Sequence, residues 1–264
     1  MTPLRNLLSV VAAFSLAACA SGGGGSTAST TTPATNTSTT APSPDPRVGL
    51  KAGMTDAGTA FWNMRLATNA PSTGKFAGST NSDLPFYKNY AIQGNYNGYQ
   101  VWDLSNPAKP VLKTSYYCPA SQSDVSVYKN LLSVSGEGTG GRLDCGGQGV
   151  QDSVSHDRLR GLRIFDITDI TNPKYVANVQ TCRGSHTHTV VTSPNDPDNA
   201  YVYISGSAPV RSPTELPGCV RQSPDSNPNS SLFRIEVIRV PLANPQQAAV
   251  VASARFLDSL APPP

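Results

Sequence analysis

The sequence predicts an all-β fold made of about three units of four short antiparallel strands, and three observations carry this prediction. The phrase Gly98-Tyr-Gln-Val-Trp-Asp-Leu-Ser-Asn-Pro is rewritten as Gly161-Leu-Arg-Ile-Phe-Asp-Ile-Thr followed by Asn172-Pro173, 63 residues later (161 − 98). Such self-similarity is typical of repeat architectures. Short apolar runs bounded by Gly, Asn and Pro indicate strands throughout, and no helical period appears after the N-terminal apolar stretch.

The predicted strands follow the same order in each unit. In the first unit they cover residues 83–86, 90–94, 99–104 and 111–118. In the second unit they cover 124–128, 131–135, 162–167 and 175–182. In the third unit they cover 188–192, 200–204, 232–240 and 248–256. Long insertions, residues 136–160 and 207–231, separate the second strand from the third in the last two units.

Four-stranded antiparallel units of this kind, which cannot bury both faces alone, are typical of β-propeller blades. A β-sandwich is the main competing interpretation, but it does not require the same turn phrase at equivalent places in successive units. We therefore predict a β-propeller-like array. Because propellers usually close with about four to eight blades, we expect an open or partial ring, from truncation at the C-terminus or from completion by another chain. Self-association through the open blade edge follows as an expectation.

The repeated phrase has a structural role in this interpretation. The restricted backbone of Pro107 and Pro173 starts a turn. Asp103 and Asp166, at the ends of the third strands, are expected to accept hydrogen bonds from turn amides. We expect no catalytic pairing of these two carboxylates, because they lie in different blades.

The N-terminus predicts export. Residues 1–18 contain Arg5, a short apolar stretch and Leu16-Ala17-Ala18 before Cys19. This order resembles the bacterial lipoprotein signal, and the resemblance implies cleavage before Cys19 and lipidation of its thiol and new amine. Residues 19–47 are rich in Ser, Thr, Gly and Pro and predict a disordered tether, and residues 48–264 hold the blades. We expect a chain anchored by lipid in the cell envelope, at the outer membrane if the cell has one.

Charge gives no indication of a nucleic-acid partner. The formal net charge is +3 over 264 residues, and no block of Lys or Arg stands out. Nucleic-acid binding would need a clustered basic surface, so we predict none.

Four cysteines remain beyond Cys19, and four cysteines allow three pairings. Cys118 and Cys182 each end a fourth strand, and Cys145 and Cys219 each lie in the insertion of the following unit. Equivalent positions predict equivalent bonds, Cys118–Cys145 and Cys182–Cys219, which an oxidising compartment would allow. A zinc site is the alternative, but no spacing matches a zinc ribbon or finger.

The three histidines suggest a metal-site hypothesis. His186 and His188 lead into a first strand, where alternation places both imidazoles on one face. Asp124 begins the equivalent strand of the preceding unit and is a conceivable third ligand, whereas His156 lies in the Gly-rich insertion. The alternative is a polar strand start that is hydrogen-bonded within the protein.

The runs Trp102-Asp-Leu-Ser-Asn-Pro-Ala-Lys-Pro-Val and Ile164-Phe-Asp-Ile-Thr with Asn172-Pro-Lys-Tyr-Val resemble the LVIVD repeat. That family implies β-propellers of secreted and cell-surface proteins, mostly without an assigned activity. The resemblance extends over about residues 83–256, and it is weak in the third unit, where Arg239-Val-Pro-Leu lacks the Asp.

Two functions follow from these observations. We expect a lipid-anchored, non-catalytic module that binds a protein or glycan ligand through its insertions and needs no cofactor. The alternative is a metal-dependent oxidoreductase that resembles selenium-binding proteins, which are copper-dependent thiol oxidases, and that would hold copper or zinc at His186 and His188. No nucleophile elbow or interpretable carboxylate pair is present, so no catalytic residue is predicted.

Overall fold

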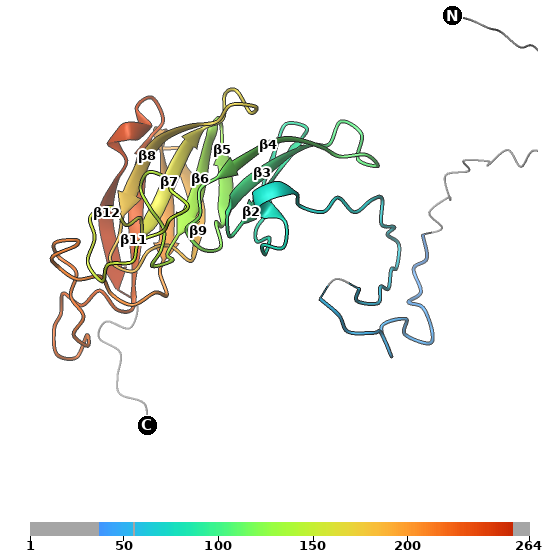
Figure 1. Ribbon diagram of the computed structural model, residues 1–264, viewed down its shortest axis with the longest axis horizontal. Helices are drawn as coiled ribbons and strands as arrows, with labels where there is room; N and C mark the ends of the chain where they lie inside the picture. The colour runs from blue at the N-terminus through green and yellow to red at the C-terminus, as the bar shows by residue number, and fades with distance from the viewer. Residues whose placement is uncertain (1–36, 55, 256–264) are drawn as a thin grey trace, which may run out of the picture. The chain divides into compact units, whose positions relative to one another are not determined.

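The computed structural model describes residues 37–54 and 56–255 (Figure 1). Cys19, the predicted signal peptide, most of the predicted tether and the last predicted strand residue, Phe256, lie outside the described residues. The chain divides between residues 65 and 66 into two units, and the strands of the described residues all lie in the second. The predicted domain boundary at residue 48 stays a prediction.

Twelve strands form three separate four-stranded antiparallel sheets, as predicted. The first sheet contains β1 (Phe86–Tyr87), β2 (Tyr90–Asn95), β3 (Gly98–Asp103) and β4 (Val111–Tyr117). The second contains β5 (Val125–Tyr128), β6 (Leu131–Gly136), β7 (Gly161–Asp166) and β8 (Lys174–Gln180). The third contains β9 (Thr187–Ser193), β10 (Asp196–Ser205), β11 (Arg234–Pro241) and β12 (Ala249–Arg255). Two short 3-10 helices, η1 (Gly74–Phe76) and η2 (Pro245–Gln247), complete the elements.

The third sheet has the same topology as the other two, although the repeated sequence motif is only weakly recognisable in it. Within each sheet, neighbouring strands are consecutive in the chain. The pairing of the third strand with the fourth is interrupted after Val101, after Ile164 and after Val237. A bulge at the same place in all three sheets aligns Val237 with Val101 and Ile164 and confirms the predicted repeat. No sheet closes on itself within the described residues.

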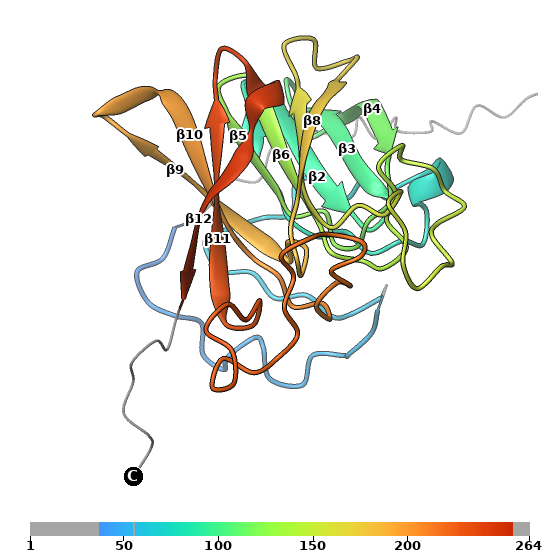
Figure 2. The same ribbon diagram turned by 90° about the vertical axis from the view of Figure 1, so that its left-hand side faces the viewer.

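The β5–β8 sheet lies between the other two (Figures 1 and 2). One of its faces packs on the first sheet around Phe165, whose ring lies 5.2 Å from that of Tyr99 and 4.9 Å from that of Tyr116. The other face packs on the third sheet through Leu162 and Ile164. Burial on both faces explains why β7 reads Leu-Arg-Ile-Phe without a simple alternation of apolar and polar residues.

The repeated turns form the predicted hydrogen bonds. One carboxylate oxygen of Asp103 accepts the backbone N–H of Ser105 at 2.9 Å, and Asp166 accepts that of Thr168 at 2.8 Å. The side-chain amides of two preceding turn residues, Asn89 and Asn130, donate to the same carboxylates. In the first and second sheets, the aspartate of the Asx turn therefore also connects the third strand to the loop between the first two strands.

Glycine is required where the third strand begins in the first and second sheets. Gly98 and Gly161 have φ angles of +129° and +150°. A Cβ atom at either position would meet a backbone oxygen of the fourth strand, that of Tyr116 at 2.1 Å or of Val179 at 1.9 Å. The first residue of the repeated phrase thus allows close approach of two strands.

Two carboxylates connect neighbouring sheets at their first strands. Asp83 precedes β1 and accepts the backbone N–H of Val125, at the start of β5, at 3.3 Å. Asp124 precedes β5 and accepts the backbone N–H of His188, near the start of β9, at 2.8 Å. The same hydrogen bond therefore recurs from the first sheet to the second and from the second to the third.

Both predicted disulfides are present and both attach an insertion to a fourth strand. Cys118, directly after β4, is bonded to Cys145, and Cys182, just after β8, is bonded to Cys219. Cys145 lies in the first insertion (residues 137–160) and Cys219 in the second insertion (residues 206–233). Each insertion is thereby fixed to the sheet that precedes its own.

Candidate functional site

The predicted metal ligands lie in a polar cluster at the first strands of the second and third sheets. This inner-strand cluster comprises Asp124, Ser135, Glu137, His186 and His188. Asp124 precedes β5, Ser135 lies near the end of β6, and Glu137 directly follows that strand. The histidines flank the first residue of β9. Neighbouring first strands contact each other here, which brings residues about 50 to 65 positions apart in the chain into hydrogen-bond distance.

Each histidine faces its own carboxylate. His188 is fully buried at its side chain, and its Nδ1 lies 2.8 Å from Oγ of Ser135 and 3.1 Å from the carboxylate of Asp124. His186 is 44% exposed at its side chain, and its Nδ1 lies 2.5 Å from Glu137. Asp124, the conceivable third ligand, therefore lies beside His188, and its role as a metal ligand stays a prediction.

Both carboxylates are held in the ionised form. Burial by itself raises the pKa of Asp124, but hydrogen bonds from the side chain and backbone of His188 outweigh burial and lower it. Burial likewise raises the pKa of Glu137, and the backbone N–H of Ser207 and the imidazole of His186 lower it overall. Ser207 donates its N–H to Glu137 at 2.9 Å, so this carboxylate also fixes the start of the second insertion.

The arrangement of these two pairs does not fit a metal centre. Among residues 37–54 and 56–255, no group of three or more His, Cys, Asp or Glu side chains is placed to hold a metal ion. A catalytic zinc or copper site needs three protein ligands directed at one point, whereas these histidines turn to different carboxylates. His156 is exposed in the first insertion. We therefore derive no metal chemistry from the inner-strand cluster.

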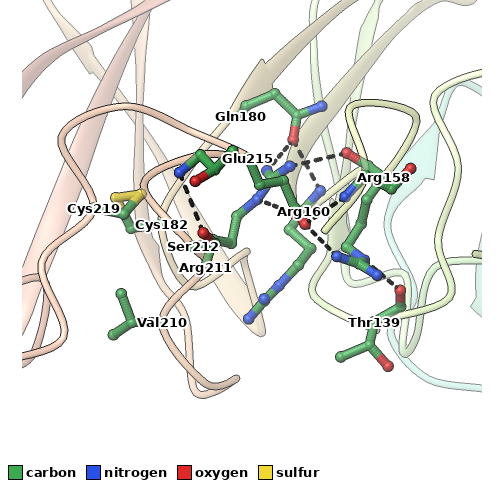
Figure 3. A network of polar contacts seen from close by, with 12 residues as sticks. Thr139, Arg158, Arg160, Gln180, Cys182, Val210, Arg211, Ser212, Glu215 and Cys219 are labelled. Atoms are coloured by element: carbon green, nitrogen blue, oxygen red, sulfur yellow. Dashed lines mark hydrogen bonds and ion pairs between the residues drawn. A yellow bond between two sulfur atoms is a disulfide. The ribbon is translucent and has the colours of Figure 1, made fainter. Parts of the chain in front are cut away.

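A second polar cluster joins the two insertions (Figure 3). This arginine cluster comprises Arg158 and Arg160 at the end of the first insertion, Arg211 and Glu215 in the second, and Gln180 at the end of β8. Leu159, between the first two arginines, is fully buried in the core. Alternation in this extended segment therefore directs Arg158 and Arg160 away from the core and toward the second insertion.

Glu215 is the centre of the arginine cluster. Its carboxylate is ion-paired with Arg158 through one oxygen and with Nε of Arg211, at 2.6 Å, through the other. These three side chains are at most 7% exposed. Burial raises the pKa of Glu215, but the N–H of Ser155 and the two guanidinium groups lower it overall. The carboxylate is therefore ionised and already shared between two cations.

Arg160 has no carboxylate partner among the described residues. Its Nη2 donates to the backbone oxygen of Pro209, while its Nε is buried without a hydrogen-bond partner. The residue is only 4% exposed. Burial and the neighbouring charge of Arg211 lower the pKa of Arg160 to about 10, so the group is still cationic at neutral pH.

The arginine cluster forms one wall of a pocket of about 290 Å³ between the insertions. Four arginines and two carboxylates line it, so its walls carry two more positive than negative charges (4 − 2). The disulfide Cys182–Cys219 lies beside the arginine cluster in Figure 3. The pocket is therefore polar, cationic and built on covalently attached loops.

The sequence predicts ligand binding by the insertions but not this pocket, because its residues come mainly from two insertions that have no periodicity. The one local signal is Arg158-Leu-Arg160, which places a buried apolar residue between two arginines. Arg158 and Glu215 are 57 residues apart in the sequence, which is too far for a short sequence motif to indicate their contact.

Comparison with known proteins identifies the first sheet. The LVIVD repeat family model matches residues 78–117, which contain β1 to β4. This match agrees with the predicted resemblance in that unit, and three four-stranded sheets fit a repeat family of the β-propeller type. No curated protein matches the chain.

Proposed function

We propose that this chain, which contains an LVIVD repeat in a β-propeller-like array, is a lipid-anchored extracytoplasmic module that binds a protein or glycan ligand through its two insertions. The main observation behind the proposal is that buried ion pairs connect the two insertions. Glu215 of the second insertion pairs with Arg158 of the first and with Arg211. Loops held on a rigid scaffold are where binding surfaces concentrate.

The two insertions are held in one arrangement by several independent contacts. Each is attached to a fourth strand by a disulfide. The second is also attached to the first through Ser207 and Glu137. A surface that is ordered before the ligand arrives loses less conformational entropy on binding, which favours affinity.

The proposed location outside the cytoplasm is supported by the disulfides and by the N-terminal sequence. Two disulfides indicate an oxidising environment. Leu16-Ala-Ala-Cys19 supplies the expected lipid attachment site. No helix within residues 37–54 and 56–255 has the length and apolar character needed to cross a bilayer.

Metabolic labelling with a radioactive fatty acid tests the anchor. We expect label in the wild-type chain and its loss in Cys19→Ala, together with release of the protein from membranes. Label that persists in Cys19→Ala would contradict lipidation at this residue.

Binding is tested with the full chain against a panel of immobilised glycans and peptides. The matched variant is Glu215→Gln, which breaks the ion pairs that join the insertions but leaves the sheets and disulfides in place. Loss of binding in this variant supports the insertions as the ligand surface. Equal binding by both proteins, with the variant shown to be folded by circular dichroism, would contradict it.

The metal-dependent oxidoreductase, the alternative function that the sequence predicts, would need a third ligand that the described residues do not bring together with His186 and His188. Metal analysis of the purified full chain separates it from a binding module. Copper or zinc at one ion per chain that is lost in His188→Ala would favour the oxidoreductase.

We also propose that copies of the chain associate through the open side of the array. The face of the third sheet that points away from the second exposes Val191 and Tyr203, which are 42% and 41% accessible. Light scattering is expected to give a mass above that of one chain, and Tyr203→Lys is expected to lower it. A monomer at high micromolar concentration would contradict this proposal.

A further inference from the structure

We propose that the pocket between the insertions binds the carboxylate of a uronic-acid residue of an acidic glycan, with Arg160 as the cation that pairs with it. This inference rests on the proposed binding function and names the chemical class of its ligand. Three observations support it: the excess of positive charge in the pocket lining, the unused N–H donors of Arg160, and the volume and polar lining of the pocket.

The carboxylates that line the pocket do not neutralise Arg160. The two oxygens of Glu215 are shared between Arg158 and Arg211, so this carboxylate is not available to Arg160. The other lining carboxylate, Asp152, is exposed to solvent, and its backbone oxygen is what Arg158 contacts. A buried cation without an opposite charge is costly for a folded protein. An anionic ligand would remove that cost.

The guanidinium group of Arg160 has N–H donors that are not used within the described residues. A guanidinium presents five N–H donors. Within the described part of the chain, Arg160 uses one nitrogen, Nη2, for the backbone oxygen of Pro209. Its buried Nε has no partner. Nη1 forms no hydrogen bond within the described residues and is not fully buried, and the two terminal nitrogens of a guanidinium are one of the pairs that bind a carboxylate with two parallel hydrogen bonds.

The immediate neighbours of Arg160 favour an anion and not a second cation. Burial is the largest cause that lowers the pKa of Arg160. The charges of Arg211 and Arg158 lower it further, and those of Glu215 and Glu137 oppose them. Its own N–H is fixed by Gln180 at 3.0 Å, and its carbonyl accepts from Thr181 at 2.9 Å. The backbone that carries this cation is therefore held in place before a ligand binds.

The walls favour a sugar acid over an acidic peptide. A volume of about 290 Å³ is at the lower limit of small-ligand pockets, which suits one ring and not a folded peptide segment. The lining also contains three apolar residues, Val150, Pro209 and Val210, and four hydroxyl or amide side chains, those of Thr139, Gln151, Ser153 and Ser212. Such groups both donate and accept hydrogen bonds, as sugar hydroxyls require.

Isothermal titration of the full chain with glucuronic acid and with glucose tests the proposal, because the two sugars differ only in the carboxylate. We expect glucuronic acid to bind at least tenfold more tightly than glucose. Arg160→Met is expected to abolish this difference. Arg239→Met, on β11 and outside the pocket lining, is the matched control and is expected to leave it unchanged.

Thermal unfolding separates a binding role from a structural one. Since Arg160 is an uncompensated buried charge, Arg160→Met is expected to unfold at the same or a higher temperature than the wild type. A marked decrease would mean that Arg160 is a structural residue and would overturn the proposal.

Two further results would also overturn it. Equal affinity for glucose and glucuronic acid would exclude carboxylate recognition, although a binding role of the insertions could still be shown with another glycan. An acetylated glutamate peptide that binds as tightly as glucuronic acid, and loses binding in Arg160→Met, would assign the pocket to a protein ligand.

Discussion

Asp124 accepts a hydrogen bond of 2.8 Å from the backbone N–H of His188 and so connects the first strand of the second sheet to the first strand of the third. Its carboxylate also lies 3.1 Å from Nδ1 of the same histidine. Asp83 makes the equivalent backbone contact with Val125 one sheet earlier. The connection between neighbouring sheets is therefore encoded once per repeat.

Removal of this connection is expected to destabilise the array. Asp124→Ala leaves a buried backbone N–H without its partner, which typically costs about 1–3 kcal/mol. Chemical denaturation should show the decrease in the free energy of unfolding. Asp124→Asn keeps an acceptor at the same place and is expected to lose less. Equal losses in the two variants would show that the charge, and not the hydrogen bond, is what matters.

Stability is expected to fall in acid. Because the folded-state pKa of Asp124 and of Glu137 is lowered, their contribution is fully present above the unfolded-state values, about 3.9 and 4.3, and is lost as pH falls through the folded-state values. The free energy of unfolding should therefore decrease below about pH 5. Asp124 faces His188 and Asp83, and Glu137 faces His186.

The double variant Asp124→Asn with Glu137→Gln is the control for this acid dependence. Denaturation midpoints measured between pH 6 and pH 3 should vary less with pH in the variant than in the wild type. A variant that shows the wild-type slope would assign the acid sensitivity to other carboxylates.

The disulfide of the second insertion is expected to contribute to stability by closing a loop. Cys182 and Cys219 are 37 residues apart, and closure of a loop of this length contributes about 4 kcal/mol in the chain-entropy model. The double variant Cys182→Ser with Cys219→Ser should unfold at lower denaturant concentration. Mass spectrometry of non-reduced peptides should recover Cys182 linked to Cys219, and a peptide linking Cys182 to Cys145 would contradict the pairing.

The buried ion pairs are expected to respond strongly to loss of their common carboxylate. Glu215→Gln leaves Arg158 and Arg211 buried without an opposite charge, which typically costs about 3–5 kcal/mol. Asp144→Asn breaks the exposed pair with Arg142 and is expected to leave the unfolding midpoint nearly unchanged. Similar midpoints for both variants would indicate that the arginine cluster is hydrated and loosely held.

Two glycines of the second repeat offer a matched test of the close strand approach. Gly161→Ala places a Cβ atom 1.9 Å from the backbone oxygen of Val179 at a φ of +150°. We expect a loss of more than about 1 kcal/mol in the free energy of unfolding. Gly140→Ala meets no atom within 4 Å and should have little effect. An unchanged Gly161→Ala protein would contradict the strand register described here.

The local elements were predictable because each depends on residues that are near one another in sequence. Alternating runs bounded by Asn, Gly and Pro located all twelve strands to within a few residues, since strand pairing and turn chemistry act over short distances. The chain also contains a second short repeat, since Tyr87-Lys-Asn89 recurs as Tyr128-Lys-Asn130. It would have identified the turns whose asparagines bind Asp103 and Asp166.

By itself, the sequence determined the all-β fold, the repeat and both disulfides, because equivalent cysteines in a repeated unit must occupy equivalent places. Only the tertiary structure decided which carboxylate His186 and His188 face, and that Arg160 has no carboxylate partner within the described part of the chain. Those partners come from different sheets and insertions, and the insertions have no periodicity from which to read an orientation. Their side chains meet because packing the sheets side by side brings together residues that are 49 to 64 positions apart.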